Sequence, residues 1–279
     1  SSNLLQSPIK SHTPLSGGDI SKVYLLETST QKLFLKTHQG ILGKQMLSAE
    51  KIGLEHIANT KSIKTPQVYF LEEYQDTSLL VMEYIETKNP NSKDHKKLGF
   101  QLAEFHKNNT TEFGFDTNNF IGSLPQSNSK HNSWASFYVN ERLLPQINLA
   151  KEKSLLSEKE IPNSEKLLNT CEKLFPIIKP SLLHGDLWGG NYLIATDGTP
   201  YLIDPAVYYG HSEVDLAMSR LFGGFSADFY KAYHEISSNL LGENERIDIY
   251  QLYYLLVHLN LFGKGYYRQV KWILDYYFS

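Results

Sequence analysis

The chain has 279 residues, of which 41% are hydrophobic and 20% charged, with a formal net charge of −3 and a single cysteine. This balance is that of an ordinary globular protein with a substantial core, and the absence of a basic excess argues against a nucleic-acid partner. The lone Cys171 excludes an internal disulfide framework and is typical of a reducing compartment, so we expect a cytoplasmic protein.

The first 85 residues alternate short apolar runs with turns and contain one predicted helix, over residues 43–59. This pattern predicts a small antiparallel sheet with one helix packed on it. The apolar runs that we assign to strands are residues 23–26, 33–35, 68–71 and 79–84.

The predicted helix carries a carboxylate in its apolar stripe. Glu50 shares one helical face with Leu47, Leu54 and Ile57. A carboxylate in that position is costly unless it is paired, and Lys36, at the end of the preceding strand, is the obvious partner. Kinases use a strand lysine and a helix glutamate in this way to hold nucleotide phosphates. The alternative is that both residues are solvated surface charges.

Upstream, Gly17 and Gly18 lie between two extended segments. Glycines let backbone amides approach phosphates, which makes this turn a candidate nucleotide contact. An ordinary hairpin turn explains the two glycines equally well.

A polar run over residues 86–97 predicts the crossing between two lobes, residues 1–85 and 86–279. Beyond it the sequence is mainly helical, apart from a long stretch over residues 108–134 that has little periodicity and is of a length that is often functional in compact domains. The last strongly apolar stretch, residues 252–262, is interrupted by His258 and Asn260 and is too short to span a membrane. The predicted helices of this part are residues 96–108, 133–148, 164–175, 214–222, 227–241, 245–262 and 266–278.

The most informative segment is residues 183–191, followed by residues 203–206. Asn191 lies five residues after Asp186, the gap between the catalytic Asp and the metal-binding Asn of kinase catalytic loops. A short predicted hairpin, residues 192–194 and 201–203, carries Asp204 back beside Asn191. One carboxylate to deprotonate an acceptor hydroxyl and two oxygen ligands for Mg²⁺ are what phosphoryl transfer from ATP requires. The alternative, that these are only turn residues, explains each fragment alone but not their combination.

Taken together, these segments resemble the fructosamine kinases, or ketosamine kinases, within the aminoglycoside-phosphotransferase-like and protein-kinase-like folds. The most specific part is residues 185–191, because relatives that act on aminoglycosides or choline usually carry His-Pro-Gly or similar where Trp188-Gly189-Gly190 stand here. Other matching segments are residues 16–18, 34–36, 49–54, 65–68, 80–85, 113–115, 210–218 and 221–225, so that nearly the whole chain is covered.

The resemblance implies an α+β, bilobal protein-kinase-like fold with a small antiparallel-sheet N-lobe carrying one helix and a larger, mainly helical C-lobe. It also implies ATP-dependent phosphorylation of the sugar 3-hydroxyl of ketosamines, the glycation adducts of amines, which is a deglycation repair activity. By position, Asp186 is the base, Asn191 and Asp204 are the Mg²⁺ ligands, Lys36 contacts the nucleotide phosphates and Glu50 orients Lys36.

The same resemblance implies roles for the remaining candidates. Backbone atoms of Glu83 and Ile85 meet the adenine, Trp188 lines the sugar pocket, and Asp215 with His184 braces the catalytic loop. Glu213 is a candidate substrate contact. Some family members carry a redox-active cysteine where Asp19 stands, which puts such control in question here.

Three alternatives bear on function. A kinase for another small alcohol, such as an aminoglycoside, choline or homoserine, has the same core chemistry. A protein kinase is disfavoured because the Asp-Phe-Gly and Ala-Pro-Glu elements are absent. A nucleotide-binding pseudoenzyme usually lacks one of the four central residues, and all are present: Lys36, Asp186, Asn191 and Asp204. The sugar, its amine carrier, whether free or protein-bound, and the oligomeric state stay open.

Overall fold

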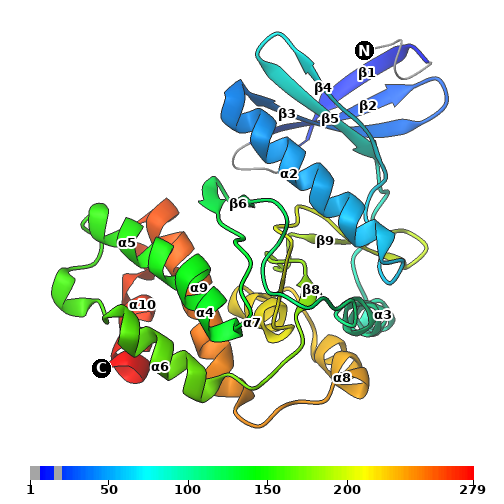
Figure 1. Cartoon of the computed structure of the whole chain (residues 1–279). Coiled ribbons are helices and arrows are strands. Elements are labelled where there is room, and N and C mark those ends of the chain that lie inside the picture. The colour runs from blue at the N-terminus through cyan, green and yellow to red at the C-terminus, as the bar shows by residue number, and fades with distance from the viewer. Residues whose placement is uncertain (1–6, 16–20) are drawn as a thin grey trace.

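The computed structural model describes residues 7–15 and 21–279. Its N-terminal part is a five-stranded sheet with the strand order β1-β2-β3-β5-β4, all neighbours antiparallel, and one long helix, α2, lies across it (Figure 1). The elements are β1 (Ile9–Pro14), β2 (Lys22–Thr28), β3 (Lys32–Gln39), α2 (Gly40–Asn59), β4 (Val68–Tyr74) and β5 (Thr77–Glu83). The predicted sheet and helix are therefore confirmed, and β1, which pairs with β2 at the edge of the sheet, is a strand that the predicted runs did not include.

Alternation along β5 explains how the sheet and α2 pack. Leu80 and Met82 face α2, where they join Leu47 and Leu54 in a buried cluster. Val81 points to the opposite face of the sheet, where it packs with Leu26 and Leu33. A strand with apolar residues on both faces is expected in the interior of a sheet, where both sides are covered.

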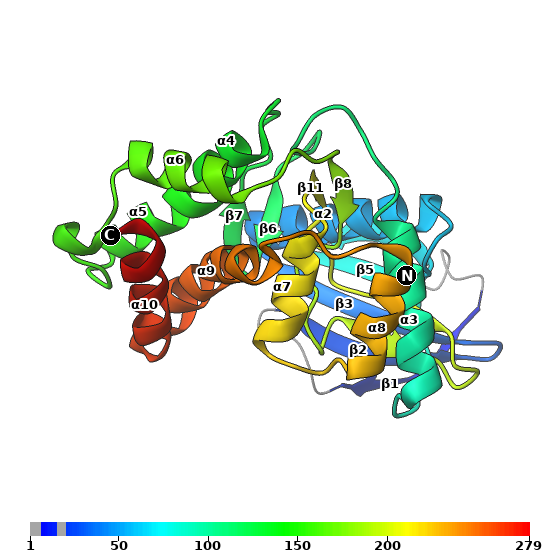
Figure 2. The same ribbon diagram turned by 90° about the horizontal axis from the view of Figure 1, so that it is seen from below.

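The rest of the chain is mainly helical, and the long helix α9 runs through its centre (Figure 1). Figure 2 shows α3 alongside α8, with α7 next to them. The close approach of α3 and α8 requires Gly99, because a Cβ atom there would lie 2.3 Å from the carbonyl oxygen of Phe229. The helices are α3 (Ser92–Phe105), α4 (Trp134–Tyr138), α5 (Leu144–Glu152), α6 (Ser164–Leu174), α7 (Glu213–Leu221), α8 (Ala227–Ile236), α9 (Glu243–Phe262) and α10 (Tyr267–Phe278).

Several predicted helix boundaries were wrong, and three of the predicted helices differ most from those observed. The helix expected over residues 96–108 begins at Ser92, because Asn91 and Asp94 form a capping box. The helix expected over residues 133–148 is divided by a π-helical turn, Val139–Leu143, which ends one residue before Pro145, whose missing N–H and ring disturb a regular helix. The helix expected to reach residue 241 ends at Ile236.

Three two-stranded sheets complete the fold: β6 (Asn119–Ile121) with β7 (Leu124–Gln126), β9 (Tyr192–Ile194) with β10 (Pro200–Leu202), and β8 (Ser181–Leu183) with β11 (Tyr208–Gly210). The β9–β10 hairpin was predicted, whereas β6 and β7 lie in the stretch that we expected to be a loop. The crossing segment after β5 attaches to this hairpin, since Lys88 N donates to the carbonyl of Ile194 over 3.0 Å. The division after residue 85 stays a prediction; β5 ends at Glu83 and α3 begins at Ser92.

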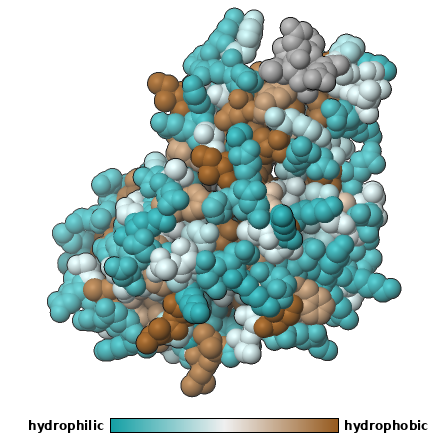
Figure 3. Space-filling view, turned by 45° about the vertical axis from the view of Figure 1, so that its right-hand side comes forward, coloured by the Kyte–Doolittle hydropathy of each residue, from teal (hydrophilic) through white to brown (hydrophobic). Residues whose placement is uncertain are grey.

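Within residues 7–15 and 21–279, no helix is both long and apolar enough to cross a membrane. On the face shown in Figure 3, hydrophobic side chains form small separate groups on a mainly hydrophilic surface.

Candidate active site

The two parts of the fold meet at an ammonium group shared by two carboxylates. Lys36 on β3 places Nζ 2.8 Å from Oε2 of Glu50 and 2.5 Å from Oδ1 of Asp204. The first contact is the predicted ion pair; the second joins the sheet to the catalytic segment. The Lys36 and Glu50 side chains are only 12% and 11% exposed, whereas that of Asp204 is 44% exposed and faces solvent between the two parts.

Charge and burial oppose each other in this triad. Burial lowers the pKa of Lys36, but the carboxylates of Glu50 and Asp204 outweigh it and raise the pKa above its ordinary value, so Lys36 stays an ammonium. Burial also raises the pKa of Glu50, against the opposing effect of Lys36. One ammonium group therefore faces two carboxyl groups, so a further cation can pair with negative charge that Lys36 does not neutralise.

The catalytic loop and the β9–β10 hairpin bring Asp186, Asn191 and Asp204 together. Asn191 Nδ2 donates to the carbonyl oxygen of Asp186 over 2.9 Å and to its Oδ2 over 3.1 Å. Ile203 N donates to the carbonyl of Asn191 over 3.1 Å, which fixes Asp204 next to Asn191 as the hairpin predicted. Asp204 itself has φ of 50°, an uncommon conformation for a residue other than glycine.

The electrostatic setting of Asp186 suits a proton acceptor. Burial, reinforced by the nearby charge of Asp204, raises the pKa of Asp186 to about 7, although the hydrogen bond from Asn191 acts in the opposite direction. A carboxylate with a raised pKa holds a proton more readily than an ordinary aspartate does.

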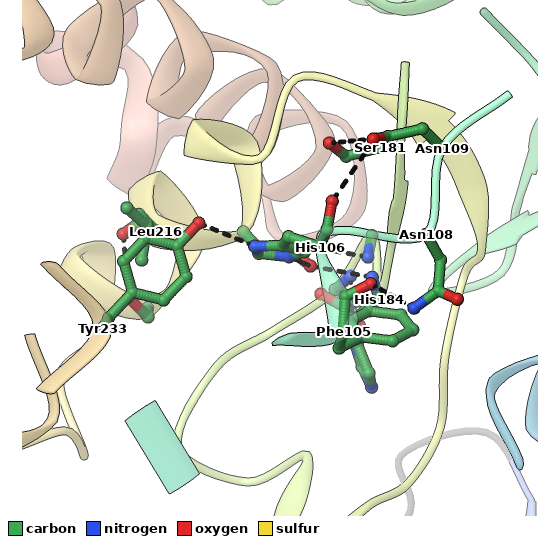
Figure 4. A network of polar contacts seen from close by, with 12 residues as sticks. Phe105, His106, Asn108, Asn109, Ser181, His184, Leu216 and Tyr233 are labelled. Carbon is green, nitrogen blue, oxygen red and sulfur yellow. Dashed lines mark hydrogen bonds and ion pairs between the residues drawn. The ribbon is translucent and has the colours of Figure 1, made fainter. Parts of the chain in front are cut away.

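Asp215, at the start of α7 and fully buried, holds the backbone of the catalytic loop. Its Oδ2 accepts from the amide of His184 over 2.7 Å and its Oδ1 from the amide of Gly185 over 2.9 Å. His106 lies 3.1 Å from the same carboxylate through Nε2 and 2.8 Å from the Tyr233 hydroxyl through Nδ1 (Figure 4). These contacts correspond to the bracing role expected of Asp215.

His184 ties the loop to the strand that precedes Asp204. Its Nε2 lies 2.8 Å from the carbonyl oxygen of Ile203, and Asp186 N donates to its Nδ1 over 3.2 Å. The ring therefore carries its proton on Nε2, and burial lowers the pKa of His184, which keeps it neutral. Because the neutral His184 ring forms a hydrogen bond through each of its nitrogens, it links Asp186 and Ile203 without adding charge to the site.

The expected substrate contact of Glu213 needs correction. Both of its carboxylate oxygens are bound by Arg246, from Nε over 2.7 Å and from the terminal NH2 group over 2.7 Å, and the residue is only 5% exposed. A bidentate arginine satisfies such a carboxylate and fixes its orientation. Glu213 thus joins α7 to α9, a pairing of distant residues that no local pattern indicated.

Trp188 is 41% exposed on the catalytic loop, and its ring lies over Gly190, where a Cβ atom would come within 2.3 Å of it. The neighbouring Gly189 packs on the turn formed by Gly223 and Gly224, where a Cβ would lie 3.0 Å from the Gly223 carbonyl oxygen. This contact places the end of α7 beside the catalytic loop.

That end of α7 carries an aromatic cluster that we did not predict. Phe222 and His258 have ring centroids 4.5 Å apart, and His258 also contacts Phe262 and Tyr266. Phe222 and Phe262 are 40% and 57% exposed. The available signal was His258 itself, a polar residue within the apolar pattern of α9.

The remaining candidates concern the nucleotide base. Glu83 ends β5, where its amide donates to the carbonyl of Gln67 over 2.8 Å. The backbone groups of Ile85 have no hydrogen-bond partner among the described residues, which leaves them available to a ligand. Gly17 and Gly18 lie outside the described residues.

The donor set fits magnesium only in company with phosphate oxygens. In the part of the chain that the structure describes, no three His, Cys, Asp or Glu residues form a metal-binding group. However, Asn191 uses its Nδ2 for Asp186, which leaves Oδ1 without a partner among these residues, and the half-exposed Asp204 lies beside it. Magnesium is commonly held by one or two protein oxygens plus substrate phosphates, so these residues fit a nucleotide-bound ion.

Comparisons with known proteins agree with this geometry. The family model described as "Fructosamine kinase" matches residues 1–279. An Enterococcus faecium protein named "Probable ketoamine kinase" is 40% identical over 266 residues, which cover 94% of this chain and 93% of that protein. The chloroplastic protein-ribulosamine 3-kinase of Arabidopsis thaliana is 36% identical over 271 residues, which cover 94% of this chain and 81% of that protein. The chloroplast in the name of the Arabidopsis protein is the compartment of that protein, and the similarity does not assign a compartment to this chain.

Solved structures give the same result. The crystal structure of a Haemophilus somnus protein assigned to the fructosamine-3-kinases superposes with a TM-score of 0.90 at 29% identity, covering 100% of this chain and 95% of that one. Aminoglycoside phosphotransferase APH(4)-Ia, in complex with ADP and hygromycin B, has a TM-score of 0.63 at 12% identity over 96% of this chain and 92% of that one. The latter likeness shows the fold alone.

Proposed function

The chain belongs to the fructosamine kinase family, a family of phosphotransferases, and on this basis we propose that it transfers the γ-phosphoryl group of ATP to the 3-hydroxyl of a ketosamine sugar. The observation that carries the proposal is the meeting of Asp186, Asn191 and Asp204 with the Lys36–Glu50 pair at the junction of the sheet and the helical part. The resemblance to this family also implies that the reaction serves as a deglycation repair activity.

Nucleotide binding rests on the residues nearest the sheet. The Lys36 ammonium contacts the phosphates, and Glu50 orients it through their ion pair. Asn191 Oδ1 and the Asp204 carboxylate would hold a nucleotide-bound magnesium ion, which would offset negative charge on the phosphates. Unpaired backbone groups at Ile85, with the backbone carbonyl of Glu83, meet the adenine.

Asp186 acts on the acceptor. Its carboxylate orients the sugar hydroxyl and accepts its proton as the phosphoryl group is transferred. Asn191 restrains Asp186 through the contact to Oδ2, and the amides fixed by Asp215 hold the loop that carries it. The raised pKa of Asp186 matches this role, because a base of higher pKa is a stronger proton acceptor.

The acceptor site extends from Asp186 along Trp188 to the aromatic cluster. Exposed aromatic faces beside a catalytic loop suit the CH face of a sugar, and Phe222, His258 and Phe262 provide further apolar surface for the amine carrier. Relatives named as a ketoamine kinase and a protein-ribulosamine 3-kinase support this acceptor class.

An acceptor panel scored by ADP release tests the proposal, with fructoselysine and ribuloselysine compared with an aminoglycoside, choline and homoserine. We expect turnover with at least one ketosamine, and mass spectrometry should locate the phosphate on the sugar 3-hydroxyl. If both ketosamines are left untouched while another alcohol turns over, the ketosamine assignment is wrong and the alternative kinase class is correct.

A further inference from the structure

The β6–β7 hairpin lies next to α2, within the long stretch of residues 108–134 that has little periodicity in the sequence (Figure 1). Its outer side, including Phe120 and Pro125, lines a groove against Ser48 and Ile52 of α2. Its inner side carries two amide side chains, those of Asn119 and Gln126. The hairpin therefore contacts the helix that supplies Glu50 and also faces the catalytic centre.

The two amides bind the main chain just after Asp204. Asn119 Nδ2 donates to the carbonyl of Val207 over 2.8 Å. Gln126 Nε2 donates to Asn119 Oδ1 over 2.7 Å and to the carbonyl of Ala206 over 3.3 Å. The hydroxyl of Tyr253, on α9, completes the chain by donating to Gln126 Oε1 over 2.6 Å.

This network is buried and its polar groups are used. Asn119 is 5% exposed, Gln126 2% and Tyr253 1%. Buried amides are costly unless their donors and acceptors are paired, and paired networks fix the positions of their partners. The network thus specifies where the carbonyls of Ala206 and Val207 lie.

The same short segment is fixed from its other side by the catalytic loop. Ala206 N donates to the carbonyl of His184 over 2.8 Å. Gly185 approaches so closely that a Cβ atom on it would lie 2.1 Å from the Ala206 carbonyl oxygen. Because Asp204 is only two residues before Ala206 and has a left-handed backbone, a shift of this segment changes the direction of the Asp204 carboxylate.

We propose that Asn119 and Gln126 are positioning residues of the kinase reaction, which hold the segment after Asp204 so that its carboxylate meets the nucleotide-bound cation beside Asn191. This inference rests on the proposed function. Groups that orient a metal ligand without touching the metal change affinity or activity by about 10- to 100-fold when they are removed.

The main variant is Asn119→Leu, which keeps the same number of side-chain heavy atoms but leaves the Val207 carbonyl without its donor and Gln126 Nε2 without its Asn119 acceptor. Its control is Asn260→Leu, because Asn260 is also a buried amide, 4% exposed. The Asn260 side chain donates to the backbone and side-chain oxygens of Gln146, each over 2.9 Å, and it lies outside the network and far from Asp204 in the sequence. Each variant loses two buried side-chain hydrogen bonds, so the two are comparable.

A gentler pair keeps the test decisive if Asn119→Leu does not fold. Tyr253→Phe removes only the hydroxyl that binds Gln126. Tyr138→Phe is its control, because Tyr138 is fully buried and donates to the carbonyls of Ile249 and Tyr250, outside the network.

Two measurements separate positioning from simple destabilisation. The first is the Mg²⁺ concentration for half-maximal turnover at saturating acceptor, which should rise about 10-fold in Asn119→Leu and less in Tyr253→Phe, with both controls close to the parent protein. The second, independent of turnover, is hydrogen exchange of residues 203–208, which should become faster in the two network variants and should be less protected by MgATP. If network and control variants agree in both measurements, the amides are structural only and the inference is wrong. If the parent protein phosphorylates no acceptor, the proposed function fails, while the exchange measurement still decides whether the network positions the segment.

Discussion

The ammonium of Lys36 lies 2.5 Å from Oδ1 of Asp204, across 168 positions of sequence. This ion pair joins β3 to the segment after the β9–β10 hairpin, and so it connects the sheet directly to the catalytic part of the fold. Since Glu50 binds the same ammonium, the position of α2 and the direction of Asp204 depend on one side chain.

Lys36→Met should weaken ATP binding and lower kcat/KM. A hydrogen bond to a charged group contributes about 1.5–3 kcal/mol, so we expect a loss of about 10-fold or more in kcat/KM for ATP. Glu50→Gln should have a smaller effect, because Lys36 keeps Asp204 as a partner. The control is Lys32→Met, since Lys32 is on the same strand but its pair with Glu86 is exposed. Equal effects at Lys32 and Lys36 would contradict a specific role for Lys36.

Asp186→Asn should remove the proton acceptor and leave nucleotide binding nearly intact. General bases contribute about 10²- to 10⁴-fold, so turnover should fall by several orders of magnitude while the dissociation constant for MgATP changes little. Stopped-assay kinetics and calorimetric titration with MgATP measure the two quantities separately. Asp275→Asn, at an exposed position of α10, is the control. Near-normal turnover in Asp186→Asn would exclude the assigned base.

Trp188→Ala should raise the KM for the ketosamine and leave that for ATP unchanged. Aromatic contacts contribute about 0.5–1.5 kcal/mol beyond area burial, which corresponds to a change of about 2- to 13-fold in KM. Trp188→Phe should retain most of the affinity, and His258→Ala should resemble Trp188→Ala if the aromatic cluster belongs to the acceptor site. Trp272→Ala provides the control, because Trp272 is exposed on α10. A parallel rise of both KM values would show that Trp188 acts through the fold of the loop.

What could be predicted from the sequence was mostly local. Glu50 stood out because a carboxylate in an apolar helical stripe needs a partner, and Lys36, at the end of the preceding predicted strand, was the obvious candidate. The β9–β10 hairpin followed from two short apolar runs around a turn, and it determined where Asp204 lies relative to Asn191.

What could not be predicted depends on contacts between distant segments. The pairing of Glu213 with Arg246 requires α7 to lie against α9. The hydrogen bond from Asn119 to the Val207 carbonyl requires the β6–β7 hairpin to reach the catalytic segment. Other errors had local causes: the capping box of Asn91 was present in the sequence but lay in a run that we interpreted as a linker.

A final prediction concerns stability at acidic pH and the buried His211. Trp134 Nε1 donates to the Tyr250 hydroxyl over 2.8 Å, and His211 Nδ1 lies 2.8 Å from that same hydroxyl, so the neutral ring accepts a hydrogen bond from the Tyr250 hydroxyl. Burial, followed by the charge of Arg246, lowers the pKa of His211 to about 3, although Glu213 lies 3.7 Å away. His211 therefore stays neutral in the native protein at most pH values.

The sign of the effect follows from the unfolded state, in which a histidine has a pKa of about 6.5. Above that value His211 is neutral in both the native and the unfolded state, so its titration does not lower the free energy of unfolding. As the pH falls from about 6.5 towards the native pKa, only the unfolded chain binds the proton, and this one group lowers the free energy of unfolding by up to about 1.4 kcal/mol per pH unit. Urea unfolding followed by tryptophan fluorescence between pH 7.5 and 5 should give a shallower pH dependence in His211→Asn than in the parent protein. His12→Asn, at an exposed position of β1, should leave the slope unchanged. An unaltered slope in His211→Asn would show that the ring is already charged in the native state or that it titrates alike in both states.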